Sequence, residues 1–178
     1  SFFFFFYYIS ISWSLCQRID KPLLTILANL IAGKIPGTGD KPVFLKDFSN
    51  HSDNQKIIYF KGNLGLSNFY YFDYKDVFQI REGLAWQKEG FHQIILKYPD
   101  EKISAEVAVA AKQRISNNKR YIDLTNTFQG FSCRDNKSNE IVLRQVDHYI
   151  VLMVRLNPDV SLAPEMDRIA LQIENLSK

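Results

Sequence analysis

The residues of this sequence best suited to metal binding or nucleophilic catalysis are its three histidines and two cysteines, namely His51, His92, His148, Cys16 and Cys133. They are scattered along the chain, and neither a His-Glu-x-x-His sequence nor a pair of Cys-x-x-Cys sequences is present. A metal site would have to be assembled entirely by the fold. The sequence therefore predicts no metal and no cofactor.

Hydrolysis by a cysteine nucleophile is a second chemistry to consider, with Cys133 as nucleophile and His148 and Asp147 as base and orienting group. Adjacent residues rarely aim both side chains at one target, and nothing around Cys133 indicates a strained nucleophile turn. Asp147 and His148 are better explained as a hairpin turn. No two of the remaining carboxylates stand out as a general acid and a general base. We therefore expect that the protein is not an enzyme.

The stretch over residues 33–42 contains glycines and lysines, but it does not match a phosphate-binding loop. A Walker A loop places Gly-Lys-Ser/Thr after a glycine and four further residues, whereas Thr38 stands five residues after Gly33. Pro42 takes the place of the third glycine of a dinucleotide fingerprint. We interpret this stretch as a linker.

The charge pattern argues against a nucleic-acid partner. The net charge is only +3, from 22 basic and 19 acidic residues, and both signs are interspersed along most of the chain. One modest basic cluster lies beside Tyr121 and comprises Lys112, Arg114, Lys119 and Arg120. It fits a solvated loop better than a site for nucleic acid or anionic lipid headgroups.

The chain begins with an uncharged, aromatic-rich run over residues 1–17. A bilayer-spanning helix needs roughly 20 apolar residues, so this run is slightly short. The stretch SWSLCQR is a poor cleavage site for a secretory signal, and Leu15 stands where a lipobox normally has a small residue before its cysteine. Three interpretations stay open: a membrane anchor, which we favour, a segment packed against protein, and an uncleaved targeting remnant. If the run is an anchor, we expect it to form a transmembrane helix. The residues in the membrane would then be Phe2, Phe3, Phe4, Phe5, Phe6 and Trp13.

Residues 22–32 show apolar side chains at helical spacing between Pro22 and Gly33, which predicts a short amphipathic helix. It would lie either in the membrane interface or on the domain. We therefore divide the chain into an apolar segment (1–17), a helix and Gly/Pro linker (18–42), and a domain (43–178). We expect membrane association, with the side and organelle left open.

The domain is predicted to be α+β, with a mostly antiparallel twisted sheet of about six strands and a C-terminal helix packed on one face. We expect strands over residues 56–62, 68–80, 91–98, 120–133, 140–146 and 149–156. Residues 104–115 fit a helix face and also a strand face, and we choose helix. The final helix begins near Pro164 and has an apolar stripe made of Met166, Ile169, Ala170, Ile173 and Leu176.

The densest cluster of aromatic residues is the most informative feature of the domain. Alternate residues of a strand point to opposite faces, so a strand here would coat both faces with aromatic rings. We expect it to form a surface for a protein partner or ligand, with an aromatic core as the alternative; its residues are Phe69, Tyr70, Tyr71, Phe72, Tyr74, Phe78 and Trp86.

The predicted function is a membrane-anchored accessory or structural subunit that binds other protein subunits and the lipid bilayer. A carrier of an apolar small molecule, such as a lipid or pigment, is the alternative.

Overall fold

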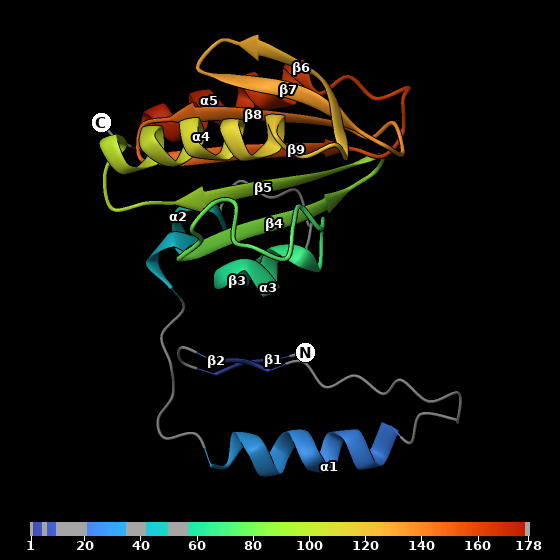
Figure 1. Ribbon diagram of the computed structural model, residues 1–178. Coiled ribbons are helices and arrows are strands. Elements are labelled where there is room, and N and C mark those ends of the chain that lie inside the picture. Colours follow the sequence, from blue (N-terminus) through green and yellow to red (C-terminus); the bar gives the residue numbers. More distant parts are fainter. Residues whose placement is uncertain (1, 5–6, 10–20, 35–41, 50–56, 177–178) are drawn as a thin grey trace. The chain divides into compact units, whose positions relative to one another are not determined.

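A computed structural model of the chain describes residues 2–4, 7–9, 21–34, 42–49 and 57–176 (Figure 1). The chain divides into two compact units, Ser1–Val43 and Phe44–Lys178. Each unit is described separately below.

The larger unit is built on one open, antiparallel sheet of seven strands in the order β3-β4-β5-β9-β8-β7-β6. The strands are β3 (Ile58–Phe60), β4 (Glu82–Lys88), β5 (Phe91–Lys97), β6 (Tyr121–Thr127), β7 (Gly130–Asp135), β8 (Glu140–Val146) and β9 (Tyr149–Arg155). The predicted α+β class with a mostly antiparallel sheet is confirmed.

Helices cover both faces of the sheet. On one face α4 (Glu101–Ser116) lies across β8 and β9, and on the other face α5 (Ala163–Leu176) packs on the same two strands (Figure 1). The shorter α2 (Val43–Ser49) is on the α5 face, where Phe48 packs edge-on against Trp86. A further short helix, α3 (Gly62–Ser67), follows β3. The C-terminal helix on one face is therefore also confirmed.

The central strand β9 illustrates why the sheet needs two covered faces. Its sequence, YIVLMVR, is an almost uninterrupted apolar run, and all its residues except Arg155 are buried. Such a run is typical of a strand buried on both sides. Edge strand β6 is the opposite case, because most of its residues are exposed and polar.

The ambiguous segment over residues 104–115 is a helix, as we chose. Asp100 caps α4 by accepting a hydrogen bond from the backbone N–H of Ile103 at 2.8 Å, and Pro99 ends the preceding segment. The buried residues of α4 follow helical spacing, namely Ser104, Val107, Ala111 and Ile115. Alanine-rich sequence and one apolar stripe together decide in favour of the helix.

Two strand predictions were wrong in detail, and one strand was missed. Residues 68–80 form an irregular segment rather than a strand, although most of its aromatic rings are buried. The predicted strand over 120–133 is a hairpin, β6–β7, that turns at Phe128 and Gln129. Strand β4 was not predicted, because Gly83 and the polar Gln87 and Lys88 weaken its apolar pattern.

The smaller unit contains a two-stranded antiparallel pair and one helix. Strands β1 (Phe2–Phe4) and β2 (Tyr7–Ile9) pair with Phe2 opposite Ile9, and α1 (Lys21–Ala32) lies where the short helix was predicted. Within the described ranges, every helix is too short or too polar to cross a bilayer. Phe2, Phe3 and Phe4 thus belong to β1 instead of the predicted transmembrane helix, while Phe5, Phe6 and Trp13 lie outside the described residues.

Candidate functional site

The predicted aromatic surface is for the most part an aromatic core. Five of its seven rings are buried, with exposed fractions of 9% or less: Phe69, Tyr70, Phe72, Phe78 and Trp86. Only Tyr71 (49% exposed) and Tyr74 (75% exposed) reach the surface. Of the predicted docking residues, these two tyrosines alone present substantial area to a partner.

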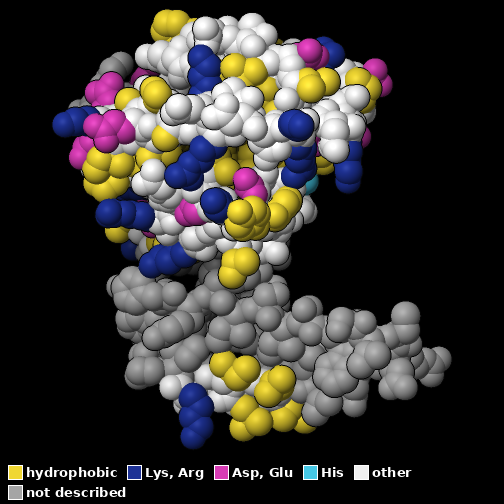
Figure 2. Space-filling model, viewed as in Figure 1, with side chains coloured by type: hydrophobic (Ala, Val, Ile, Leu, Met, Phe, Trp, Pro, Cys, Tyr) yellow, Lys and Arg dark blue, Asp and Glu magenta, His cyan; other side chains and the backbone are white. Residues whose placement is uncertain are grey.

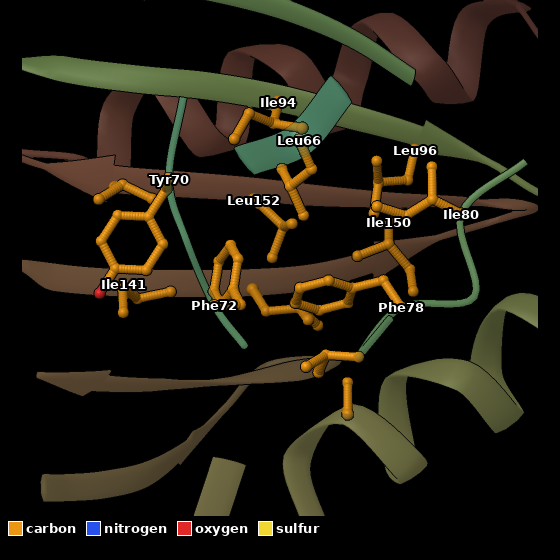
Figure 3. Close-up of a cluster of buried hydrophobic side chains, with 14 of the residues drawn as sticks. Leu66, Tyr70, Phe72, Phe78, Ile80, Ile94, Leu96, Ile141, Ile150 and Leu152 are labelled. Atoms are coloured by element: carbon orange, nitrogen blue, oxygen red, sulfur yellow. The ribbon is translucent and has the colours of Figure 1, made fainter. Parts of the chain in front are cut away.

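The irregular segment over residues 68–80 turns its rings inward because hydrogen bonds hold its backbone against the sheet. Tyr98 donates to the carbonyl of Phe78 at 2.7 Å, and Tyr121 donates to the carbonyl of Phe72 at 2.8 Å. Figure 3 shows Tyr70, Phe72 and Phe78 directed at aliphatic side chains of the sheet. These backbone carbonyls therefore accept hydrogen bonds from side chains distant in the sequence and not from a neighbouring strand.

A buried carboxylate, Asp135, ties the segment to β7. Its oxygens accept hydrogen bonds from the Tyr70 hydroxyl at 2.6 Å, from the backbone N–H of Lys137 and from both the backbone N–H and the side-chain amide of Asn139. Burial alone would raise the pKa of Asp135, but these hydrogen bonds outweigh it and lower the pKa below its ordinary value. Burial and the bond to Asp135 raise the pKa of Tyr70.

The basic cluster predicted beside Tyr121 is largely occupied within the domain. The Arg120 guanidinium lies over the rings of Tyr70, Tyr71 and Tyr121, at 5.1 to 5.8 Å from their centroids, and 3.8 Å from Asp135. Arg114 donates to the carbonyl of Asp76 at 2.6 Å. These two arginines clamp the irregular segment, so they are poorly placed to bind a separate anion.

The hydrolase candidates are not assembled into a site. Cys133 is buried in the middle of β7, and burial raises the pKa of its thiol to about 12, so the thiol stays protonated at neutral pH. His148 lies in the β8–β9 turn with its Nδ1 2.9 Å from Asp147. His92 lies on β5, and His51 is outside the described residues. No group of three potential metal ligands occurs among the described residues.

One pocket of about 510 Å³ lies between α5 and the β7–β8 part of the sheet. The loop between β9 and α5 closes one side, and Phe128, at the tip of the β6–β7 hairpin, lies over the Arg144 guanidinium at 5.1 Å. Arg144 pairs with Asp167 at 2.9 Å, and Arg155 pairs with Glu140 at 2.8 Å. The two arginine charges are thus compensated within the pocket, beside apolar walls formed by Val142, Val160, Leu162 and Met166.

A second pocket of about 380 Å³ has a different character. It lies at the end of the sheet where β3 ends, β4 begins and β5 ends, and three of its lining residues are Lys or Arg. The lining consists of Lys61, Arg81, Glu82, Lys97, Tyr98, Pro99 and His148. The strand register explains this gathering, because Glu82 is paired with Lys97, and Lys97 with Tyr149, the neighbour of His148. Sequence analysis missed this group because its members come from four separate segments.

Comparison with protein-family models, curated proteins and solved structures found no match to this chain. Function is therefore inferred from the described residues themselves. The features that could carry it are the exposed tyrosines, the two pockets and the apolar N-terminal unit. Figure 2 shows that the viewed face of the domain mixes Lys and Arg with Asp and Glu, without a continuous basic stripe of the kind that nucleic-acid binding usually requires.

Proposed function

We propose that this protein is a non-enzymatic accessory subunit of a membrane-bound protein assembly, held at the bilayer by its N-terminal unit. The observation that carries the proposal is the apolar surface of α1. Ile26, Leu27 and Leu30 are 56%, 42% and 63% exposed, and Figure 2 shows hydrophobic side chains at the surface of this helix. The uncharged run over residues 1–17 ends shortly before α1 in the sequence, with Arg18, Ile19 and Asp20 between them.

An exposed apolar helix face is unfavourable in water and favourable at the boundary between lipid headgroups and acyl chains. Burying a leucine or isoleucine side chain contributes roughly 1.5–3 kcal/mol. Three such side chains would therefore supply several kcal/mol of binding to a membrane. Lys34 is exposed just beyond the C-terminal end of α1, where an ammonium group can stay in the headgroup layer.

The domain would supply the contact with protein partners. Tyr71 and Tyr74 are exposed, and Asn63 of α3 donates to the carbonyl of Asp73 at 3.4 Å, which joins α3 to this segment. Leu64 of α3 is 86% exposed. Tyrosine is enriched at the centres of protein interfaces, and an exposed leucine beside the tyrosines adds apolar area that a partner can bury.

Vesicle flotation of the full-length chain tests the membrane association. The chain should float with phosphatidylcholine vesicles, and replacing the α1 surface in the variant Ile26→Asn/Leu27→Gln/Leu30→Gln should weaken binding by about tenfold or more. The matched control is Leu156→Gln/Leu171→Gln, which removes exposed apolar side chains of the domain. A wild-type chain that stays entirely with the soluble fraction contradicts the proposal.

Native electrophoresis of membranes solubilised from cells that express the chain tests the subunit role. The wild-type chain should migrate in an assembly much larger than its own 20.7 kDa. The variant Leu64→Ser/Tyr71→Ser/Tyr74→Ser should be released to a smaller species while it still floats with vesicles. Migration of the solubilised wild-type chain as a monomer would remove the support for an assembly.

The pocket of about 510 Å³ beside α5 favours a second candidate, a carrier of a small molecule. Its volume lies in the range of small-molecule sites, and its apolar walls and compensated arginines suit a ligand of low net charge. Native mass spectrometry of the protein would reveal a copurified ligand. The variant Val142→Trp, which fills the pocket, should displace it, and a ligand retained by this variant would place the binding elsewhere.

A further inference from the structure

The pocket beside α5 is lined by hydrogen-bonding groups that the protein uses only in part. Three hydroxyl groups line it, those of Thr127, Ser132 and Ser161, and none of them bonds to another residue that the structure describes. The Arg144 side chain is 16% exposed, and among the described residues it forms one hydrogen bond, from Nη1 to Asp167. Its Nε is buried without a partner there. A guanidinium group has five N–H donors, so most of the donors of Arg144 stay unpaired.

Two ion pairs place donors and acceptors next to each other in this lining. Arg144 Nη1 lies 2.9 Å from Asp167 Oδ1, and Arg155 Nη2 lies 2.8 Å from Glu140 Oε2. Within the described ranges, the second oxygen of each carboxylate accepts no hydrogen bond. A hydroxyl group both donates and accepts, so neighbouring hydroxyl groups of one ligand can bond to both members of such a pair.

The sheet fixes the positions of these groups. Glu140, Val142 and Arg144 alternate along β8, so their side chains share the face that α5 covers. Ser132 of β7 is paired with Val142, and Arg155 of β9 is paired with Glu140. Strand pairing therefore holds this part of the lining in place before any ligand arrives, as is usual for small-molecule sites.

Another part of the lining is apolar. Leu162 and Met166 are buried around the start of α5, and Val160 in the β9–α5 loop is half-buried. Arg155 donates to the carbonyl of Val160 at 3.3 Å, which ties the loop to the sheet. At the rim, the Phe128 ring is largely exposed and presents a flat apolar surface. The pocket thus offers one ligand both polar groups and apolar surface.

Charged ligands and wholly apolar ligands suit this lining poorly. An anion would approach the carboxylates of Glu140, Asp159 and Asp167, and a cation would approach the guanidinium groups of Arg144 and Arg155. A wholly apolar ligand would displace water from the hydroxyl and guanidinium groups without replacing its hydrogen bonds, which is unfavourable for each group that becomes buried. A neutral ligand with several hydroxyl groups avoids both penalties.

We propose that this pocket binds a neutral carbohydrate, a mono- or disaccharide. The sugar hydroxyl groups bond to Arg144, Asp167 and Ser132, and the C–H face of a sugar ring packs against Val142 and Met166. The volume of about 510 Å³ lies in the range of small-molecule sites. The inference rests on the second candidate function, the binding of a small molecule in this pocket, and specifies the class of the ligand; it does not depend on the membrane association.

Saturation-transfer NMR of the full-length protein tests the class of ligand. The protein is kept in dodecylphosphocholine micelles, because detergents with sugar headgroups would compete for the site. The probes are glucose, galactose, mannose, N-acetylglucosamine, maltose, cellobiose and lactose at millimolar concentration, and at least one of them should receive saturation from the protein.

Two double variants locate the binding. Ser132→Ala/Asp167→Ala removes a hydroxyl and a carboxylate from the pocket and should weaken sugar binding by about tenfold. The matched control is Ser116→Ala/Glu174→Ala, which removes the same two groups at exposed positions outside the pocket and should bind like the wild type. The pocket-filling variant Val142→Trp should abolish binding, and either pocket variant decides the point if the other fails to fold.

Absence of saturation transfer to every sugar of the panel would overturn the proposal, as would binding that persists unchanged in the pocket variants. Native mass spectrometry separates this result from the fate of the carrier function. A copurified lipid or pigment that Val142→Trp releases would keep the pocket as a carrier site and contradict the carbohydrate. Absence of both a copurified ligand and sugar binding would count against the carrier function as well.

Discussion

The hydroxyl of Tyr70 donates a 2.6 Å hydrogen bond to the buried carboxylate of Asp135, which lies 65 residues further along the chain. This contact joins the irregular, aromatic segment to β7 near an edge of the sheet. It also explains how a segment without strand pairing keeps a fixed position in the core. A charged group that is buried and fully hydrogen-bonded holds its partners in place, because each lost bond leaves the charge less compensated.

Removing this hydroxyl should destabilise the domain measurably. We expect Tyr70→Phe to lower the free energy of unfolding by about 1–3 kcal/mol, since Asp135 would lose a donor while remaining buried. Urea denaturation followed by tryptophan fluorescence measures the change. Tyr74→Phe is the matched control, because the Tyr74 side chain is 75% exposed, and it should change stability little. Equal stability of the two variants would show that the Tyr70 bond contributes nothing net.

Acid should weaken the attachment of α5. Hydrogen bonds from Arg168 and from Lys88 on β4 lower the pKa of Glu165 from 4.5 to about 2, against the opposing effect of burial. A carboxylate with a depressed pKa in the folded state stabilises the fold above its unfolded pKa and loses this contribution as the pH falls. Stability should therefore decline between about pH 4.5 and pH 2, by roughly 1–3 kcal/mol from this group.

The variant Glu165→Gln isolates that contribution. It should be less stable than the wild type at neutral pH and should show a flatter loss of stability on acidification, as measured by thermal unfolding at a series of pH values. Glu174→Gln changes an exposed carboxylate of the same helix and should keep the wild-type pH dependence. Parallel curves for the wild type and Glu165→Gln would contradict the assigned role.

Sequence patterns predicted the elements whose burial is periodic or continuous. The apolar run of β9 indicated a buried strand, and the stripe of Met166, Ile169 and Ile173 indicated a helix with one buried face; both are present. These patterns are reliable because a helix or strand with one chemical face has few ways to bury it. The same reasoning located the β8–β9 hairpin, whose turn residue Asp147 adopts a positive φ of 50°.

The segment around Tyr70 and the pocket at the end of the sheet could not be predicted in this way. Aromatic density indicates burial, but it does not distinguish a strand from an irregular segment whose carbonyls are satisfied by distant groups such as the Tyr98 hydroxyl. Lys61, Arg81 and Lys97 are ordinary surface residues in the sequence, and only the strand register brings them together. Both features depend on contacts between segments that are far apart in the sequence, and such contacts leave no local sequence pattern.

The thiol of Cys133 should be inert in the folded protein. Burial raises its pKa to about 12, so almost no thiolate exists at pH 8, and the side chain is only 2% exposed. In a Cys16→Ser chain, a thiol reagent should therefore leave the native protein unlabelled and react fully after denaturation in urea. Rapid labelling of the native chain would show an accessible, activated thiol and would revive cysteine chemistry at this position.

Strand β7 passes so close to β8 that Gly130 has no room for a side chain. A Cβ at this position would overlap the main-chain carbonyl of Leu143, and backbone cannot move aside as the end of a flexible side chain can. We therefore expect Gly130→Ala to destabilise the domain by about 1–3 kcal/mol and to speed amide hydrogen exchange in β6 and β7. Ser132→Ala, on the same strand, removes only a half-buried hydroxyl and should change stability far less. Wild-type stability of Gly130→Ala would mean that the two strands are further apart than their register pairing of Gly130 with Arg144 requires.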